Sequence, residues 1–194
     1  MKRITCLAIA ALLCLSADAD AQRRHRNNPF SFSPYVGAFM DAYDLEADDS
    51  NVGWLLGFRA GYRKGQRLDL HLNLGYAHVD DVATRPLPTD PIHDNRWVLL
   101  TGGADFALIP GSTSVAVGAD IGVGWRQTKP RDPPPGAAGS FGWAAYETAV
   151  PSLTLRHQFT PRAGIFLSAQ DYIFDLLEGP VQHSPALTFG LTLR

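Results

Sequence analysis

The sequence contains very little cysteine. Its two cysteines, Cys6 and Cys14, both lie within residues 1–21, which we predict to be a cleaved signal peptide. The rest of the chain can therefore form neither a disulfide nor a cysteine-ligated metal site. The bulky Leu13 precedes Cys14, which argues against lipid attachment at that cysteine. An exported protein of this kind must fold without covalent cross-links.

Long hydrophobic runs are also missing. The longest apolar stretch, residues 4–15, is shorter than the roughly 20 residues that a membrane-spanning helix needs. Two basic residues before it and a small Ala-Asp-Ala site at 19–21 give it the three parts of a signal peptide. A polar tail, 22–32, follows, and its basic cluster at 23–26 is typical of a solvated leader. If the chain crosses a membrane, it does so as strands.

An excess of charge of one sign is the third feature that the sequence lacks. It has 17 basic and 19 acidic residues, and its formal net charge is −2. Because a nucleic-acid partner requires a basic face, this balance argues against one. Hydrophobic residues make up 45% of the chain, which fits a barrel in which only alternate strand positions face lipid.

The sequence does contain a repeated alternation of apolar and polar residues. It is clearest in 52–63 and 67–79, where most alternate residues are large and apolar and most residues between them are small, polar or charged. Side chains alternate across a strand, so each segment is predicted to have one apolar face and one small or polar face. The same pattern recurs in further segments: 95–108, 114–126 and 187–194 clearly, and 34–42, 142–157 and 162–174 less regularly. In 142–157 the phase shifts near Pro151, which predicts either a bulge or an edge-like defect there.

The connections between these segments alternate in length. Three are short (64–66, 109–112 and 158–161), and four are long (42–51, 81–94, 127–141 and 175–184). Outer-membrane barrels have short periplasmic turns and longer outer loops. The sequence therefore predicts an all-β fold over 33–194, an eight-stranded antiparallel up-and-down transmembrane β-barrel.

Six aromatic residues near the strand ends predict the interfacial girdles of such a barrel. They are Trp54, Tyr62, Tyr76, Trp125, Tyr172 and Phe174.

With these strands and the final segment 187–194, the chain resembles the small bacterial outer-membrane barrels of the OmpA/OmpX type. The resemblance implies residence in the outer membrane, contact with lipid and lipopolysaccharide, and insertion by the barrel-assembly machinery. In such families the last strand is an assembly signal that usually ends in an aromatic residue, whereas this chain ends Leu193-Arg194.

The inward face is predicted to carry a polar network. An eight-stranded barrel is just wide enough for side chains to fill its interior, and buried charges need opposite partners. We interpret the network as a salt-bridged plug; a gated polar path or a catalytic cluster is the alternative. Its predicted members are Arg59, Asp69, His71, Asp105, Asp120, Arg126, Glu147 and Arg156.

No motif predicts a catalytic, cofactor or metal site. The acidic stretch 41–49 lacks the ligand register of a calcium loop, and the proline-rich stretch 129–139 is predicted to be extended, with room for a surface partner. The leading hypothesis is a monomeric, non-enzymatic barrel that serves envelope integrity or surface interaction.

Two alternatives remain open. One is a lipid A-modifying enzyme on the same fold, for which the adjacent His183 and Ser184 are the candidate pair. The other is a soluble periplasmic lipocalin-like binder with the faces inverted, so that the leucines surround an apolar ligand. Glycines share the face of the charges, which favours a crowded lumen over a solvated exterior.

Overall fold

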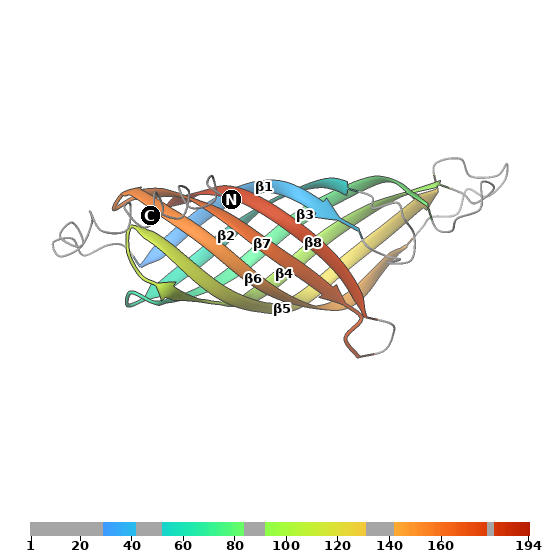
Figure 1. Ribbon diagram of the computed structural model, residues 1–194. Helices are drawn as coiled ribbons and strands as arrows, with labels where there is room; N and C mark the ends of the chain where they lie inside the picture. The colour runs from blue at the N-terminus through green and yellow to red at the C-terminus, as the bar shows by residue number, and fades with distance from the viewer. Residues whose placement is uncertain (1–28, 42–51, 84–91, 131–141, 178–180) are drawn as a thin grey trace, which may run out of the picture.

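The computed structural model describes residues 29–41, 52–83, 92–130, 142–177 and 181–194. Figure 1 shows a closed barrel in which each strand pairs antiparallel with the next and β8 pairs with β1. The strands are β1 (Phe30–Met40), β2 (Val52–Lys64), β3 (Leu68–Ala83), β4 (Ile92–Ile109), β5 (Thr113–Pro130), β6 (Trp143–Thr160), β7 (Ala163–Phe174) and β8 (Gln182–Leu193). The predicted fold class is confirmed.

The described ranges contain no helix that is long and apolar enough to cross a membrane.

The two ends of the barrel differ. Three short turns lie at one end, on the left of Figure 1, together with the C-terminus; we call it the turn end and the opposite one the loop end. Gly65, with φ of 70°, occupies the left-handed region that the first tight hairpin requires. Hydrogen bonds such as the one from Arg194 N to Arg162 O (2.9 Å) extend the pairing at this end beyond the strands.

Pro151 does not shift the strand register. The β5–β6 pairing runs unbroken from Thr113–His157 to Gln127–Trp143, and the β6–β7 pairs have the same register on both sides of the proline. Proline has no N–H to donate, so it removes a ladder hydrogen bond without requiring an extra residue. The predicted bulge was wrong; the β6–β7 pairing is instead interrupted at residues 150 and 151, as the alternative of an edge-like defect predicts.

The strands extend further than the alternation predicts. β1 begins at Phe30, inside the predicted polar tail, and β4, β5 and β6 each contain 18 residues. The signal peptide prediction for 1–21 and the stretches 42–49 and 131–139 fall outside the described residues.

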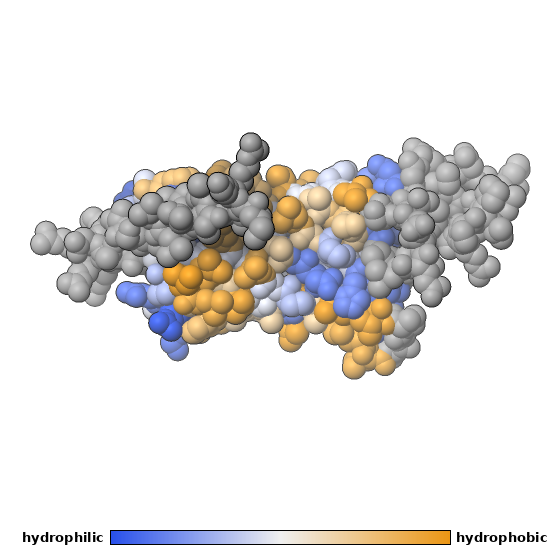
Figure 2. Space-filling model, in the orientation of Figure 1, coloured by the Kyte–Doolittle hydropathy of each residue, from blue (hydrophilic) through white to orange (hydrophobic). Residues whose placement is uncertain are grey.

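The two faces of the strands are oriented as an outer-membrane barrel requires. On β3, Leu70, Leu72 and Leu74 are exposed on the outer wall, whereas His71 and Asn73 between them are buried in the lumen. Figure 2 shows apolar side chains over large parts of the wall. The inverted arrangement, with leucines inward around an apolar ligand, is therefore not the one observed.

Candidate functional site

The lumen holds a network of ionisable side chains, which we call the charged layer. It consists of Arg59, Asp69, His71, Asp105, Asp120 and Arg156. These side chains come from the five consecutive strands β2 to β6, each at an inward position set by the two-residue period. Six of the eight predicted network residues thus meet in one cluster.

Asp105 is the acceptor at the centre of the charged layer. Its Oδ2 accepts from Arg59 Nη1 at 2.9 Å and also from Arg156 Nη2. The Nη1 of the same Arg156 donates to Asp69 at 2.7 Å, and Arg59 Nε donates to Asn73 Oδ1 at 2.8 Å. The pairing matters because an isolated charge in this interior would cost several kcal/mol.

Asp120 is surrounded by donors. His71 Nε2 lies 2.7 Å from Asp120 Oδ1, and Thr101 donates to Asp120 Oδ2 at 3.1 Å. Asn73 donates to the same oxygen and so links Asp120 to Arg59. The sequence analysis missed Asn73 and Thr101 as members, although both occupy the inward face of strands whose charges it did assign.

Two glycines make room for the carboxylates. A Cβ on Gly118 would collide with Asp105 Oδ1, and a Cβ on Gly103 would collide with Asp120 Oδ1. Both glycines lie on the lumen face of β4 or β5. Any side chain there would displace a carboxylate from its ion pair.

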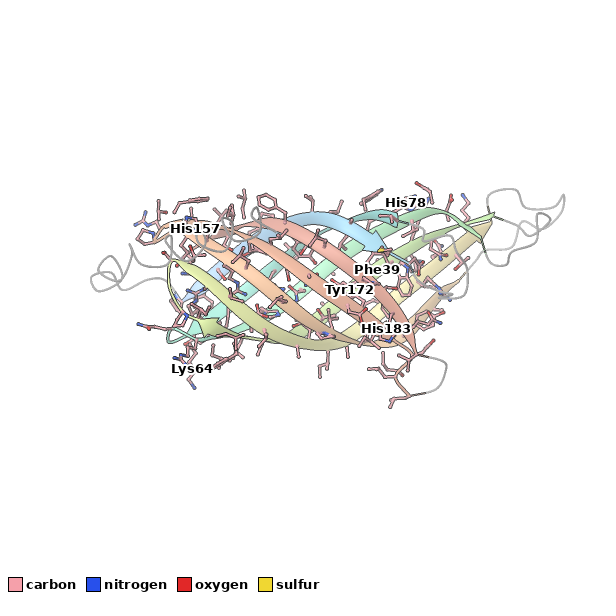
Figure 3. All side chains as sticks on the ribbon, in the orientation of Figure 1. Phe39, Lys64, His78, His157, Tyr172 and His183 are labelled. Carbon is pink, nitrogen blue, oxygen red and sulfur yellow. The ribbon has the colours of Figure 1, made fainter. Side chains whose placement is uncertain are left out.

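An aromatic and aliphatic cluster fills the lumen between the charged layer and the loop end, and we call it the apolar layer. Trp97 and Phe174 stack with ring centroids 4.3 Å apart, and Phe39 meets Tyr172 edge-on at 5.7 Å. Phe39 and Tyr172 enter it from β1 and β7 (Figure 3). The layer contains Tyr35, Phe39, Leu55, Val79, Trp97, Leu99, Val150, Tyr172 and Phe174.

The apolar layer corrects part of the girdle prediction. Tyr172 and Phe174 are 2% and 0% exposed and lie inside the barrel, not at a membrane interface. Both faces of β7 carry large apolar side chains, so the pattern alone did not show which face was inward. Trp54 and Tyr62, by contrast, are exposed on the outer wall toward opposite ends of β2, as girdle residues are.

Arg126 lies apart from the charged layer. Its guanidinium packs 5.4 Å from the Trp97 ring and 4.9 Å from the Tyr146 ring, and Nη2 donates to the Tyr146 hydroxyl at 2.7 Å. Asp41, just beyond β1, accepts from Asn95 at 2.7 Å and from Trp97 Nε1 at 3.2 Å. Burial raises the pKa of the Asp41 carboxyl, and the two donors and Arg126 only partly offset it.

Glu147 does not belong to the lumen. It is exposed on the outer face of β6, between the inward-facing Tyr146 and Thr148. The prediction was wrong because it assumed a change of phase at Pro151. Without that change, Arg156 and Glu147 must lie on opposite faces of the strand.

His183 and Ser184 cannot act as a base and its nucleophile. His183 lies on the outer wall near the loop end (Figure 3), where its Nδ1 is 2.7 Å from Asp171 Oδ2. Ser184 is 1% exposed and points into the lumen. Adjacent residues of a strand face opposite sides, so the pair fails the contact that a base needs with its hydroxyl. Among the described residues there is also no cluster of metal ligands.

Comparison with known proteins finds matches by structure but none by sequence. No protein-family model and no curated protein matches this sequence. Among solved structures, Neisserial surface protein A (NspA) has a TM-score of 0.60 at 14% identity, over 86% of this chain and 97% of that one. The chain has the fold of the small eight-stranded outer-membrane barrels.

Two further structures share this fold. OprG from Pseudomonas aeruginosa gives a TM-score of 0.51 at 12% identity, covering 86% of this chain and 96% of that one. A major outer membrane protein from Thermus thermophilus gives 0.50 at 15%, covering 86% and 100%. The resemblance predicted from the alternation and the loop lengths is thus confirmed at the level of fold.

Proposed function

We propose that the protein is a non-enzymatic barrel of the bacterial outer membrane, with a plugged lumen, that serves envelope integrity or surface interaction through its loop end. One observation supports the proposal of a plugged lumen: the charged layer and the apolar layer lie one after the other along the barrel interior. The charged layer is closed by ion pairs and the apolar layer by stacked rings. An ion crossing the barrel would have to break the first and then dehydrate in the second.

Outer-membrane residence is supported by the outer wall. Leu72 on β3 is 55% exposed, and Leu153 on β6 is 53% exposed. In water such a wall would be a large apolar patch of a kind that soluble monomers rarely expose. Lipid and lipopolysaccharide would cover it, and insertion would require the barrel-assembly machinery.

The absence of enzymatic activity is supported by the separation of His183 from Ser184 by the barrel wall. Surface interaction would then depend on the side chains of the loop end. That end carries exposed apolar residues, including Leu177 at 79% exposure.

The first experiment is fractionation of the expressed protein, followed by gel mobility with and without boiling. We expect an outer-membrane protein that migrates differently after boiling. A soluble periplasmic protein without that shift would overturn the proposal of membrane residence.

The plug is tested by conductance of the purified barrel in planar bilayers. Because the layers are in series, we expect no channels from the wild type, from an Asp105→Ala/Arg156→Ala variant, or from a Trp97→Ala/Phe174→Ala variant. Only the combined fourfold variant should conduct. Steady conductance by the wild type would refute a plugged lumen.

A further inference from the structure

A small polar cavity opens at the turn end of the lumen, below the charged layer. It has a volume of about 20 Å³, which is enough for one water-sized group. Ser31, Ser33, Arg63, Asp69, Arg156 and Arg194 are among its lining residues. They come from the turn-end parts of β1, β2, β3 and β6 and from the residue after β8.

The charge around the cavity is unbalanced. Four arginines line it, Arg59 of the charged layer together with Arg63, Arg156 and Arg194, and Asp69 is the carboxylate among the lining side chains. Arg156 already pairs with Asp69 at 2.7 Å through Nη1, and its Nη2 pairs with Asp105. Arg63 and Arg194 form no ion pair within 4 Å among the described residues.

Unsatisfied polar atoms mark the same place. Arg194 Nε and Asp69 Oδ1 are both buried and have no hydrogen-bond partner among the described residues. The pKa of Arg194 is lowered to about 10, chiefly by burial and then by the positive charge of Arg63, with Asp69 opposing the shift. Only Arg194 Nε is a donor: a buried donor without a partner costs free energy, which an anion accepting from it would recover, whereas Asp69 Oδ1 is an acceptor.

The turns around the mouth add positive charge. Lys64, Arg67 and Arg162 are all exposed at this end, and Figure 3 shows Lys64 and His157 at the same end of the barrel. These three exposed side chains are all basic, so they would attract an anion to the turn end.

We propose that the turn end binds a phosphoryl group, with one oxygen inserted in the cavity between Arg63, Arg156 and Arg194. The volume admits a single oxygen, so the rest of the group stays at the mouth. A tetrahedral phosphoryl group suits this arrangement because its other oxygens can accept from the guanidinium groups at the rim. Neither the membrane residence nor the plug accounts for this site, so the inference goes beyond the function proposed above.

The phosphoryl group has two sources at this position. One is free inorganic phosphate in the compartment that the turn end faces. The other is the headgroup of a phospholipid in the adjacent leaflet, whose phosphate lies at the level of the barrel rim. Both present the same oxygens to the arginines, and the experiment below separates them.

The test uses the full barrel, folded in a maltoside detergent because that detergent carries no phosphate. Amide NMR shifts are followed while inorganic phosphate is added, and sodium chloride of equal ionic strength serves as the reference. In a parallel arm, short-chain phosphatidylglycerol is added in place of phosphate. Folding of every variant is checked by its mobility shift on boiling, so a failure to fold is recognised separately.

We expect saturable shifts at the cavity, around Arg63, Asp69 and Gly164, in at least one arm. Saturation by phosphate identifies the free anion, and saturation by the lipid alone identifies the headgroup. Arg63→Gln and Arg194→Gln should each weaken binding about tenfold, as the loss of one charge-assisted hydrogen bond predicts. Arg162→Gln removes the same charge from an exposed turn outside the cavity and should leave binding within about twofold.

Two results would overturn the proposal. The first is the absence of saturable shifts in both arms with the folded wild type. The second is an Arg162→Gln variant that loses as much affinity as Arg194→Gln, because binding would then be nonspecific attraction to a basic rim.

Discussion

Arg156 on β6 and Asp69 on β3 form an ion pair of 2.7 Å across the lumen. On the barrel wall, β4 and β5 lie between these two strands. The same arginine forms a second ion pair with Asp105 on β4, and Asp105 also pairs with Arg59 on β2. The network therefore braces the cross-section of the barrel, in addition to the backbone ladder that joins neighbouring strands.

Replacing the central carboxylate should destabilise the barrel strongly. In Asp105→Asn, Arg59 and Arg156 lose the negative charge that they share, and an unneutralised buried charge costs about 3–5 kcal/mol. The free energy of unfolding, measured by urea titration in phospholipid vesicles, should fall by that amount. Glu147→Gln is the matched control, because it removes the same charge from the outer wall, and its effect should stay within about 0.5 kcal/mol. Equal effects of the two changes would contradict the lumen network.

A charge on the outer wall distinguishes lipid from water around the barrel. Leu72 is 55% exposed on the outer face of β3, and a bilayer covering that face would make Leu72→Arg cost up to about 2–4 kcal/mol. Gln66→Arg, in the exposed turn before β3, should be nearly neutral. Unfolding in phospholipid vesicles measures both. If Leu72→Arg were as well tolerated as Gln66→Arg, the wall would not face lipid.

The apolar layer should contribute to stability like the core of a soluble protein. Trp97 is fully buried and stacks on Phe174, so Trp97→Ala should lower the unfolding free energy by about 3–5 kcal/mol. Trp54→Ala removes the same side chain from the outer wall, where it is 45% exposed, and should cost clearly less. The same urea titration measures both variants, and equal losses would show that Trp97 does not have a core role.

Asp41 should make stability depend on pH in an unusual direction. Folding raises the pKa of its carboxyl above the ordinary value of about 3.9. The folded protein therefore binds this proton more readily than the unfolded chain, and the contribution to stability falls as pH rises from about 4 through the raised pKa. Asp41→Asn keeps an acceptor for Trp97 and removes the titration.

The measurement for Asp41 is the unfolding temperature of both proteins across mildly acidic to neutral pH. The advantage of Asp41→Asn over the wild type should grow as pH rises through that window and then level off. A constant difference across the range would show that Asp41 titrates as it does in the unfolded chain.

Much of the fold was predictable because one physical constraint acts along most of the chain. A wall that faces lipid must be apolar at every second residue, so Leu70, Leu72 and Leu74 fix the faces of β3 and place His71 and Asn73 inside. The ends of the strands were predicted less well, because no lipid constrains the residues beyond the membrane. The last residues of β3 pair with β4 although they carry no clear alternation.

The errors inside the barrel have physical causes of their own. Glu147 was misplaced because a proline can either bulge a strand or simply lose one hydrogen bond, and the sequence does not distinguish the two. Tyr172 and Phe174 were misplaced because aromatic residues near strand ends suit an interface as well as a packed interior. Trp97 could have been found by extending the inward positions Asp105, Gly103 and Thr101 back along β4.

The pairing of β1 with β8, as in Phe32–Leu193 and Tyr35–Gly190, closes the sheet into a ring. Where β6 and β7 pair, the ring has no first or last described strand, so that part of the wall has no edge strand. Residues 143–147 at the loop end of β6 pair with β5 alone. Another polypeptide therefore cannot add a strand along the closed part of the wall, the route that open sheets offer. Recognition of a partner there must rest on side chains.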